Sequence, residues 1–147
     1  MSFPLLVQVP PEEWHRLLAD WSWLVPGTFS PMAATLFGDA FLVGNQGEVQ
    51  FLDAVQGQLI PVTESEEAFQ QQLQIGKWRE LLRADLAEQL WAKGLCPRED
   101  ECYGYRIPPI LGGNVIPGNI QVFSRLVYMS TQGQLHRQFQ GKTGPVR

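Results

Sequence analysis

Residues 37–62 read FGDAFLVGNQGEVQFLDAVQGQLIPV, and this segment gives the clearest evidence for the fold class. It contains three short apolar runs, 41–43, 49–52 and 59–62, separated by turns that contain glycine. Apolar runs of this length joined by short turns predict an antiparallel meander. Pro61 has no amide hydrogen to donate to a neighbouring strand, so we expect the third strand to lie at an edge of the sheet or to end there.

Upstream of the meander, the pattern changes to that of a helix. Two prolines and two acidic residues over 10–13 suit a first helical turn, and apolar residues follow at helical spacing. This predicts a helix over about 10–25, which ends at a Pro-Gly turn. Residues 28–36 are ambiguous, with Ser30-Pro31 as one candidate start of a short helix.

Downstream of the meander, the sequence predicts two helices. Thr63 and Glu66 have the spacing of a capping box, with Thr63 as the N-cap. Gly76 is expected to interrupt the first helix. A second helix is expected over about 78–93, with Gly94 suited to its C-terminal cap.

The last third of the chain reads as strands. Residues 102–107 have the composition of a strand, and 108–114 have that of a rigid loop followed by a flexible one. A last hairpin is expected from strands at 125–129 and 135–139, with a turn at Gly133 between them.

Together these patterns predict an α+β fold with an antiparallel or mixed sheet of about five to six strands and helices packed on one face. At 147 residues the chain is expected to form one domain, 1–147. Its expected parts are an N-terminal helix at about 10–25, a strand meander at 37–62, a helical pair at 64–94, C-terminal strands at 101–140 and a loose tail at 141–147.

Charge is distributed unevenly along the chain. Residues 1–76 contain nine acidic residues and one basic residue, Arg16, whereas 77–147 contain six acidic and ten basic residues. An acidic half repels nucleic acid and anionic membranes and attracts basic proteins. With a pI near 5.1 and no apolar run of membrane-spanning length, we expect neither a nucleic-acid nor a membrane partner.

No catalytic or metal-binding constellation is recognisable. His15 and His136 lie far apart in the sequence without a metal-ligand spacing, and Cys96 and Cys102 lack the two further ligands of a zinc site. The sequence therefore predicts neither an enzyme nor a cofactor or metal site. Two cysteines and an N-terminus without a basic segment favour a reducing, cytoplasmic location.

Several motifs follow one another in the order of a known family. They are Phe37-Gly38-Asp39-Ala40-Phe41-Leu42, Val49-x-Phe51-Leu52-Asp53, Glu67-x-Phe69-x-x-x-Leu73, Cys102-Tyr103-Gly104-Tyr105 and Pro108-Pro109-x-Leu111-Gly112-Gly113-Asn114. Over roughly residues 21–140 the chain resembles a bacterial domain-of-unknown-function family found as the C-terminal domain of type VI secretion immunity proteins, where it typically follows a GAD-like domain. The Tyr-Pro-Pro-Leu-Gly-Gly segment is the most specific part.

The resemblance implies a non-enzymatic immunity protein that binds and neutralises a bacterial toxin, with nuclease effectors as one candidate class. Combined with the charge distribution, it predicts a basic toxin as partner, held by acidic side chains. The candidate partner-binding residues are Asp39, Glu48, Asp53, Glu64 and Glu67. The alternative is a small-molecule-binding or regulatory domain, which the aromatic content and the Gly112-Gly113 loop would suit. The sequence leaves the oligomeric state open.

Overall fold

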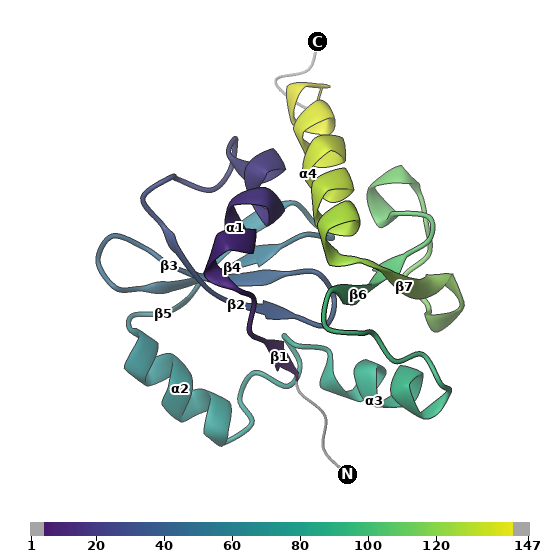
Figure 1. The fold of residues 1–147 in the computed structure, drawn as a ribbon, viewed down its shortest axis with the longest axis horizontal. Coiled ribbons are helices and arrows are strands. Elements are labelled where there is room, and N and C mark those ends of the chain that lie inside the picture. The colour runs from purple at the N-terminus through teal and green to yellow at the C-terminus, as the bar shows by residue number, and fades with distance from the viewer. Residues whose placement is uncertain (1–4, 143–147) are drawn as a thin grey trace.

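The computed structural model describes residues 5–142 and has an α+β fold (Figure 1). Its larger sheet is antiparallel throughout and has the strand order β1-β2-β3-β4-β5, which confirms the predicted fold class. The strands are β1 (Leu6–Val7), β2 (Ser30–Thr35), β3 (Ala40–Val43), β4 (Val49–Asp53) and β5 (Gln58–Thr63). A separate two-stranded ribbon is formed by β6 (Glu101–Tyr105) and β7 (Ile120–Ser124).

Four α-helices and three short 3-10 helices complete the described fold. The α-helices are α1 (Pro11–Leu17), α2 (Glu66–Gln74), α3 (Ala84–Ala92) and α4 (Arg125–Lys142). The 3-10 helices are η1 (Ala19–Trp21), η2 (Pro109–Leu111) and η3 (Pro117–Asn119). None of the helices in the described part of the chain is both long and apolar enough to cross a membrane.

The predicted meander is present as β3, β4 and β5, with Phe41 opposite Phe51 and Phe51 opposite Ile60. As predicted, Pro61 lies in an edge strand. A register shift between Val49 and Gln50 adds a bulge to the same strand pair. Proline and a bulge both make an edge strand a poor template for further pairing.

Helical segments cover both faces of the larger sheet, so the expectation of helices on one face is wrong. Phe41 and Leu42 are neighbours in β3 and both are fully buried, although neighbouring strand residues point to opposite faces. On the Leu42 side lies a cluster with α1, η1 and Met129 of α4. On the Phe41 side lies a cluster with Phe69 of α2 and the segment that follows it.

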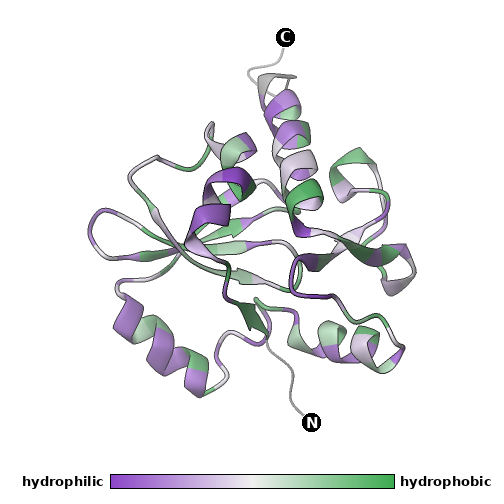
Figure 2. Ribbon diagram, in the orientation of Figure 1, coloured by the Kyte–Doolittle hydropathy of each residue, from purple (hydrophilic) through white to green (hydrophobic). Residues whose placement is uncertain are grey.

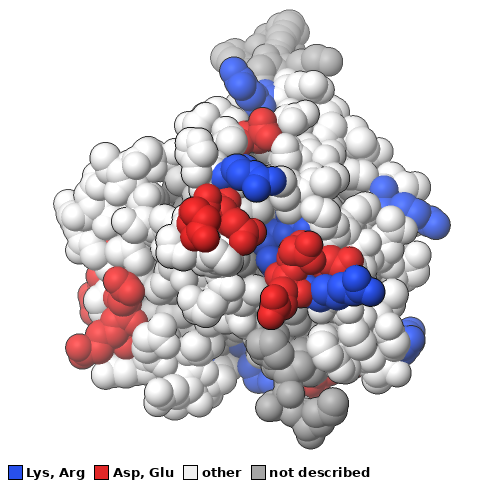
Figure 3. Space-filling model, in the orientation of Figure 1, with Lys and Arg blue, Asp and Glu red and all other residues white. Residues whose placement is uncertain are grey.

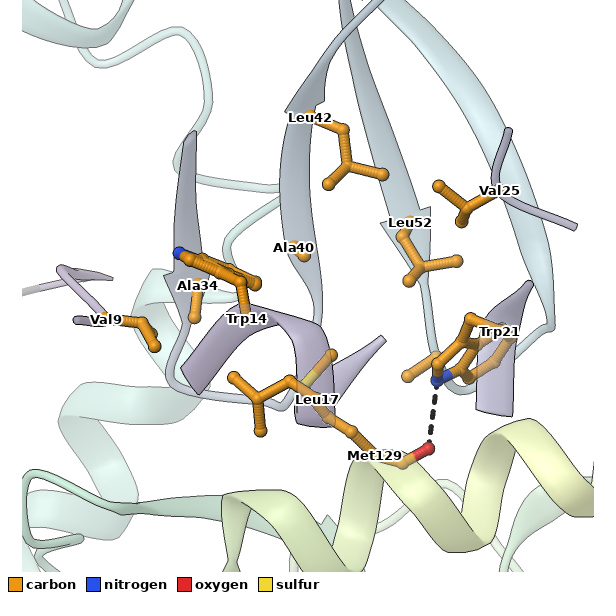
Figure 4. Packing of buried hydrophobic residues seen from close by; sticks show 11 residues of the cluster. Val9, Trp14, Leu17, Trp21, Val25, Ala34, Ala40, Leu42, Leu52 and Met129 are labelled. Carbon is orange, nitrogen blue, oxygen red and sulfur yellow. Dashed lines mark hydrogen bonds between the residues drawn. The ribbon is translucent and has the colours of Figure 1, made fainter. Parts of the chain in front are cut away.

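Figure 4 shows the cluster on the Leu42 face, where Ala40, Leu42 and Leu52 lie opposite Trp21 and Met129. A third cluster joins α3 to the ribbon through Leu90, Tyr103 and Ile120. In the ribbon of Figure 2, green hydrophobic residues are frequent along the strands, whereas α2 is mostly purple, the colour of hydrophilic residues.

Three predicted helix boundaries are wrong. The N-terminal helix is α1 followed by η1, and the N-cap of α2 is Ser65 instead of Thr63, since the Ser65 hydroxyl accepts a 3.1 Å hydrogen bond from the amide of Ala68. The helix expected over 78–93 begins at Ala84, because Arg83 adopts a left-handed conformation with φ of 54°. The breaks expected at Gly76 and Gly94 are confirmed, as both have positive φ angles.

The largest correction concerns the C-terminal region, where the hairpin expected over 125–139 is the 18-residue helix α4. Ser124 caps this helix, with its hydroxyl accepting a 3.2 Å hydrogen bond from the amide of Val127. Gly133 lies within the helix and makes no turn. Residues 28–36, read as ambiguous, contain β2. The expected tail lies outside the described residues, except for 141 and 142, which belong to α4.

Candidate functional site

Two of the predicted partner-binding carboxylates, Asp39 and Asp53, are buried, with exposed fractions of 1% and 6%. Asp39 accepts a 2.8 Å hydrogen bond from the amide of Ala54, and Asp53 accepts bonds of 3.0 Å from the amides of Val55 and Gln56. Both carboxylates thus satisfy backbone donors in the turn after β4. A partner cannot contact them directly, so this part of the prediction is wrong.

Burial raises the pKa of Asp39 to about 7, although the nearby positive charge of Arg83 and the hydrogen bond from Ala54 both lower it. The guanidinium of Arg83 lies 5.2 Å from the centre of the Phe37 ring. Asp39 therefore belongs to an internal polar cluster whose charge depends on pH within the physiological range.

The other three predicted residues, Glu48, Glu64 and Glu67, lie at one corner of the molecule. Val49 pairs with Thr63, so Glu48 and Glu64 adjoin paired positions of neighbouring strands, and Glu67 lies in the first turn of α2. Glu64 and Glu67 are exposed and Glu48 is half-buried. Figure 3 shows red atoms gathered at the lower left, over the beginning of α2. We call these three residues and Glu66 the acidic corner.

Glu48 is the most constrained member of the acidic corner. Its carboxylate accepts hydrogen bonds from the amide of Gln46 at 3.0 Å and from the side chain of Gln50 at 3.2 Å. Hydrogen bonds from the backbone amides of Glu48 itself and of Gln46 lower the pKa of its carboxyl. Glu48 therefore closes the β3–β4 turn, and Glu64 and Glu67 remain the more accessible charges.

The histidines and cysteines are dispersed. His136 is buried in α4 with Nε2 3.0 Å from the carbonyl oxygen of Val55, and burial lowers its pKa, whereas His15 is exposed on α1. Cys102 is buried, which raises the pKa of its thiol to about 12. Within residues 5–142, no three His, Cys, Asp or Glu side chains come together in a group that could hold a metal ion.

A hollow of about 470 Å³ lies between α1 and the segment before β6, with Glu13, Asp100 and Arg125 among its lining residues. Arg125 is 4% exposed and donates hydrogen bonds of 2.8 Å to the carbonyl oxygens of Glu99 and Glu101. Its guanidinium thus ties the segment before β6 to the first turn of α4.

The connection between β6 and β7, residues 106–119, carries a feature that the sequence did not reveal. We call it the apolar loop. Ile107, Leu111, Val115 and Ile116 are each at least half exposed, although they are large hydrophobic residues. The sequence pattern identified a rigid turn here, but exposure of these side chains follows only from the way the loop folds.

Asn119 holds the apolar loop in one conformation. Its side chain is 7% exposed, accepts a 3.0 Å hydrogen bond from the amide of Ile107 and donates bonds of 2.9 Å to the carbonyl oxygens of Ile107 and Asn114. Gly113 lies against the same region, and a Cβ atom added there would lie 1.7 Å from the carbonyl oxygen of Ile107. The loop is therefore ordered by buried polar contacts while its apolar side chains face outward.

Replacing Gly113 by alanine is expected to lower the free energy of unfolding by about 2 kcal/mol, because the new methyl group meets backbone and the loop must shift. Gly118→Ala is the matched control, since an added Cβ there meets no atom within 4 Å. It should stay within about 0.5 kcal/mol of wild type in the same urea titration. Equal stabilities of the two variants would contradict the packing at Gly113.

Comparisons with known proteins place this arrangement in a family. The family model described as "T6SS immunity protein Tdi1, C-terminal" matches residues 63–136, half of the chain. The fold is similar to the crystal structure of Atu4351 from Agrobacterium tumefaciens, with a TM-score of 0.58 and 15% sequence identity over 86% of this chain. This chain spans 65% of the length of that protein, and the likeness shows the fold alone. No curated protein matches the sequence. The chain belongs to the family of type VI secretion immunity proteins defined by the C-terminal region of Tdi1.

Proposed function

We propose that this protein is a non-enzymatic, cytoplasmic immunity protein that binds a basic toxin and blocks its activity. The observation that carries the proposal is the family match over 63–136, which includes α2, α3, the β6–β7 ribbon and most of α4. Nucleases are a candidate toxin class, because a surface that binds nucleic acid is basic and an acidic inhibitor complements it.

The acidic corner supports an electrostatic role in this proposal. Glu64 and Glu67 are exposed, and neither takes part in a salt bridge within the described part of the chain, where Arg79 with Asp85 and Glu88 forms the pairs found. Unpaired surface charges of one sign raise the rate of encounter with an oppositely charged partner more than they raise affinity.

The proposal is tested with a candidate toxin, the product of the open reading frame beside this gene. Co-expression of the two proteins should restore growth, and the purified proteins should form a complex. A toxin that kills equally well in the presence of this protein, with no complex detected by pull-down, would rule out the immunity role.

Charge reversal at the acidic corner is expected to slow association with that toxin. The variant Glu64→Lys/Glu67→Lys should reduce the association rate about tenfold at low salt, and the loss should shrink as salt is raised to physiological strength. Stopped-flow or biolayer measurements at two ionic strengths would record it.

The matched control for this experiment is Glu12→Lys/Glu13→Lys, which reverses two exposed acids in the first turn of α1. Its effect on helix stability should have the same sign, because Glu67, like Glu12 and Glu13, lies in the first turn of a helix and interacts with the helix dipole. An equal loss of association rate in both double variants would show that only net charge matters.

A further inference from the structure

The apolar loop concentrates exposed hydrophobic side chains. In the described part of the chain six large hydrophobic residues are exposed, and four of them lie within residues 107–116. In Figure 2, part of the ribbon of this loop is green, the colour of hydrophobic residues, and lies beside α4. Single exposed hydrophobic residues are ordinary, but several in one short segment indicate a surface that contacts another molecule.

Contacts within the loop fix a conformation in which these side chains are exposed. Asn119 makes three hydrogen bonds to the backbone of the loop, and Gly113 packs without space for a side chain. Ile110, by contrast, is half-buried and lines a hollow with His136 and Phe139 of α4. A preformed loop loses little conformational entropy on binding, which is an advantage for a binding surface and is not required of a passive connection.

The charge of the apolar loop indicates which kind of partner surface would complement it. Arg106 is the sole charged residue in 106–119, and no aspartate or glutamate occurs from residue 102 to the end of the sequence. A complementary surface is therefore apolar and carries an acidic side chain near Arg106. The whole loop also lies inside the matched region 63–136, whereas Glu48 and nearly all of the five-stranded sheet lie outside it.

From these observations we infer that the apolar loop is the anchor by which this protein holds its toxin, with Leu111 and Ile116 entering an apolar depression that has an acidic side chain at its edge. The inference rests on the proposed immunity function and identifies the surface of this protein that binds the toxin. In this arrangement the acidic corner sets the rate of encounter and the apolar loop sets the lifetime of the complex, because buried apolar anchors act mainly on dissociation.

The test is the affinity of Leu111→Ser/Ile116→Ser for the toxin encoded beside the gene. We expect the dissociation constant to rise at least about tenfold, through faster dissociation, with the salt dependence of association unchanged. Ile75→Ser is the matched control, because Ile75 is an exposed isoleucine outside the loop, 79% exposed at the end of α2. It should bind as wild type does.

The outcomes are distinguishable. If wild type binds the toxin and the double variant binds as tightly as Ile75→Ser, the loop is not the anchor and the immunity function stands. If wild type neither binds nor protects, both proposals fall. If wild type is a dimer without toxin and the double variant is a monomer, the loop serves a second copy of the chain and the proposal is overturned. If circular dichroism shows that the double variant is misfolded, Arg106→Glu is tested in its place. This variant is also expected to weaken binding of the toxin.

Discussion

Trp21→Ala is expected to lower the free energy of unfolding by about 4 kcal/mol, the range for a large aromatic side chain removed from a core. Trp21 is fully buried, and its indole nitrogen donates a 2.9 Å hydrogen bond to the carbonyl oxygen of Met129 in α4 (Figure 4). The substitution leaves a cavity and removes this hydrogen bond at the junction of η1, α4 and the sheet. Since small domains have total stabilities of about 5–15 kcal/mol, a large share of the stability would be lost.

The matched control for this substitution is Trp23→Ala. Trp23 stacks on Trp21 with ring centres 5.8 Å apart, but it is only half-buried. We expect it to cost less than half as much as Trp21→Ala. Urea unfolding followed by far-ultraviolet circular dichroism avoids the loss of tryptophan fluorescence. Trp23 also contacts α4, through a 3.2 Å hydrogen bond from its indole nitrogen to the carbonyl oxygen of Gly133. Equal losses in the two variants would therefore show that the deeper burial of Trp21 adds little to stability.

The helical pattern around Trp21 was visible in the sequence, but its partner in α4 was not. Residues 125–139 suggested a hairpin because β-branched and aromatic residues precede a glycine that resembles a turn. The structure gives that glycine another role, since a Cβ atom at Gly133 would lie 2.6 Å from the backbone carbonyl oxygen of Asp20. A glycine needed for close helix packing and one needed for a turn look alike in a sequence.

Local signals explain which strands could be predicted. The runs that became β3, β4 and β5 are neighbours in sequence and are joined by short turns, so their pairing needs no distant information. β2 pairs with the next strand, β3, and also with β1, more than twenty residues earlier in the chain, but its proline resembles a helix start. Strand pairing on both sides overrode the local preference of this stretch.

The candidate site was predicted in part for a similar reason. Glu64 and Glu67 precede or begin a helix, where the sequence predicts exposure, and the structure agrees. Asp39 and Asp53 have the same charge but meet amide donors of the turn after β4, contacts that form only when the meander folds. The apolar loop was missed because hydrophobicity predicts burial, and exposure here depends on the contacts made by Asn119.

The second large effect that we expect is a dependence of the free energy of unfolding on pH, caused by the buried carboxyl of Asp39. Burial raises the pKa of its carboxyl from 3.8 to about 7. Between about pH 4 and pH 7 the folded protein therefore holds a proton that the unfolded chain has released. Stability falls with rising pH wherever the folded state binds more protons, so this group lowers the free energy of unfolding across that window and adds no further change above it. The shift corresponds to a loss of up to roughly 4 kcal/mol.

Asp39→Asn is expected to remove this dependence. The amide oxygen can still accept the hydrogen bond from Ala54, and an asparagine cannot ionise. The difference in unfolding free energy between Asp39→Asn and wild type should therefore shift in favour of the variant as pH rises from about 4 to 7.5.

Comparing the variant with wild type at each pH cancels the opposite contribution of His136. The lowered pKa of His136 makes the folded state more stable as pH rises, and it does so in both proteins. Asp53→Asn, which replaces a second buried carboxylate in the same turn, should keep most of the wild-type dependence. Urea titrations at four pH values would measure all three proteins, and parallel curves for wild type and Asp39→Asn would show that Asp39 is ionised throughout.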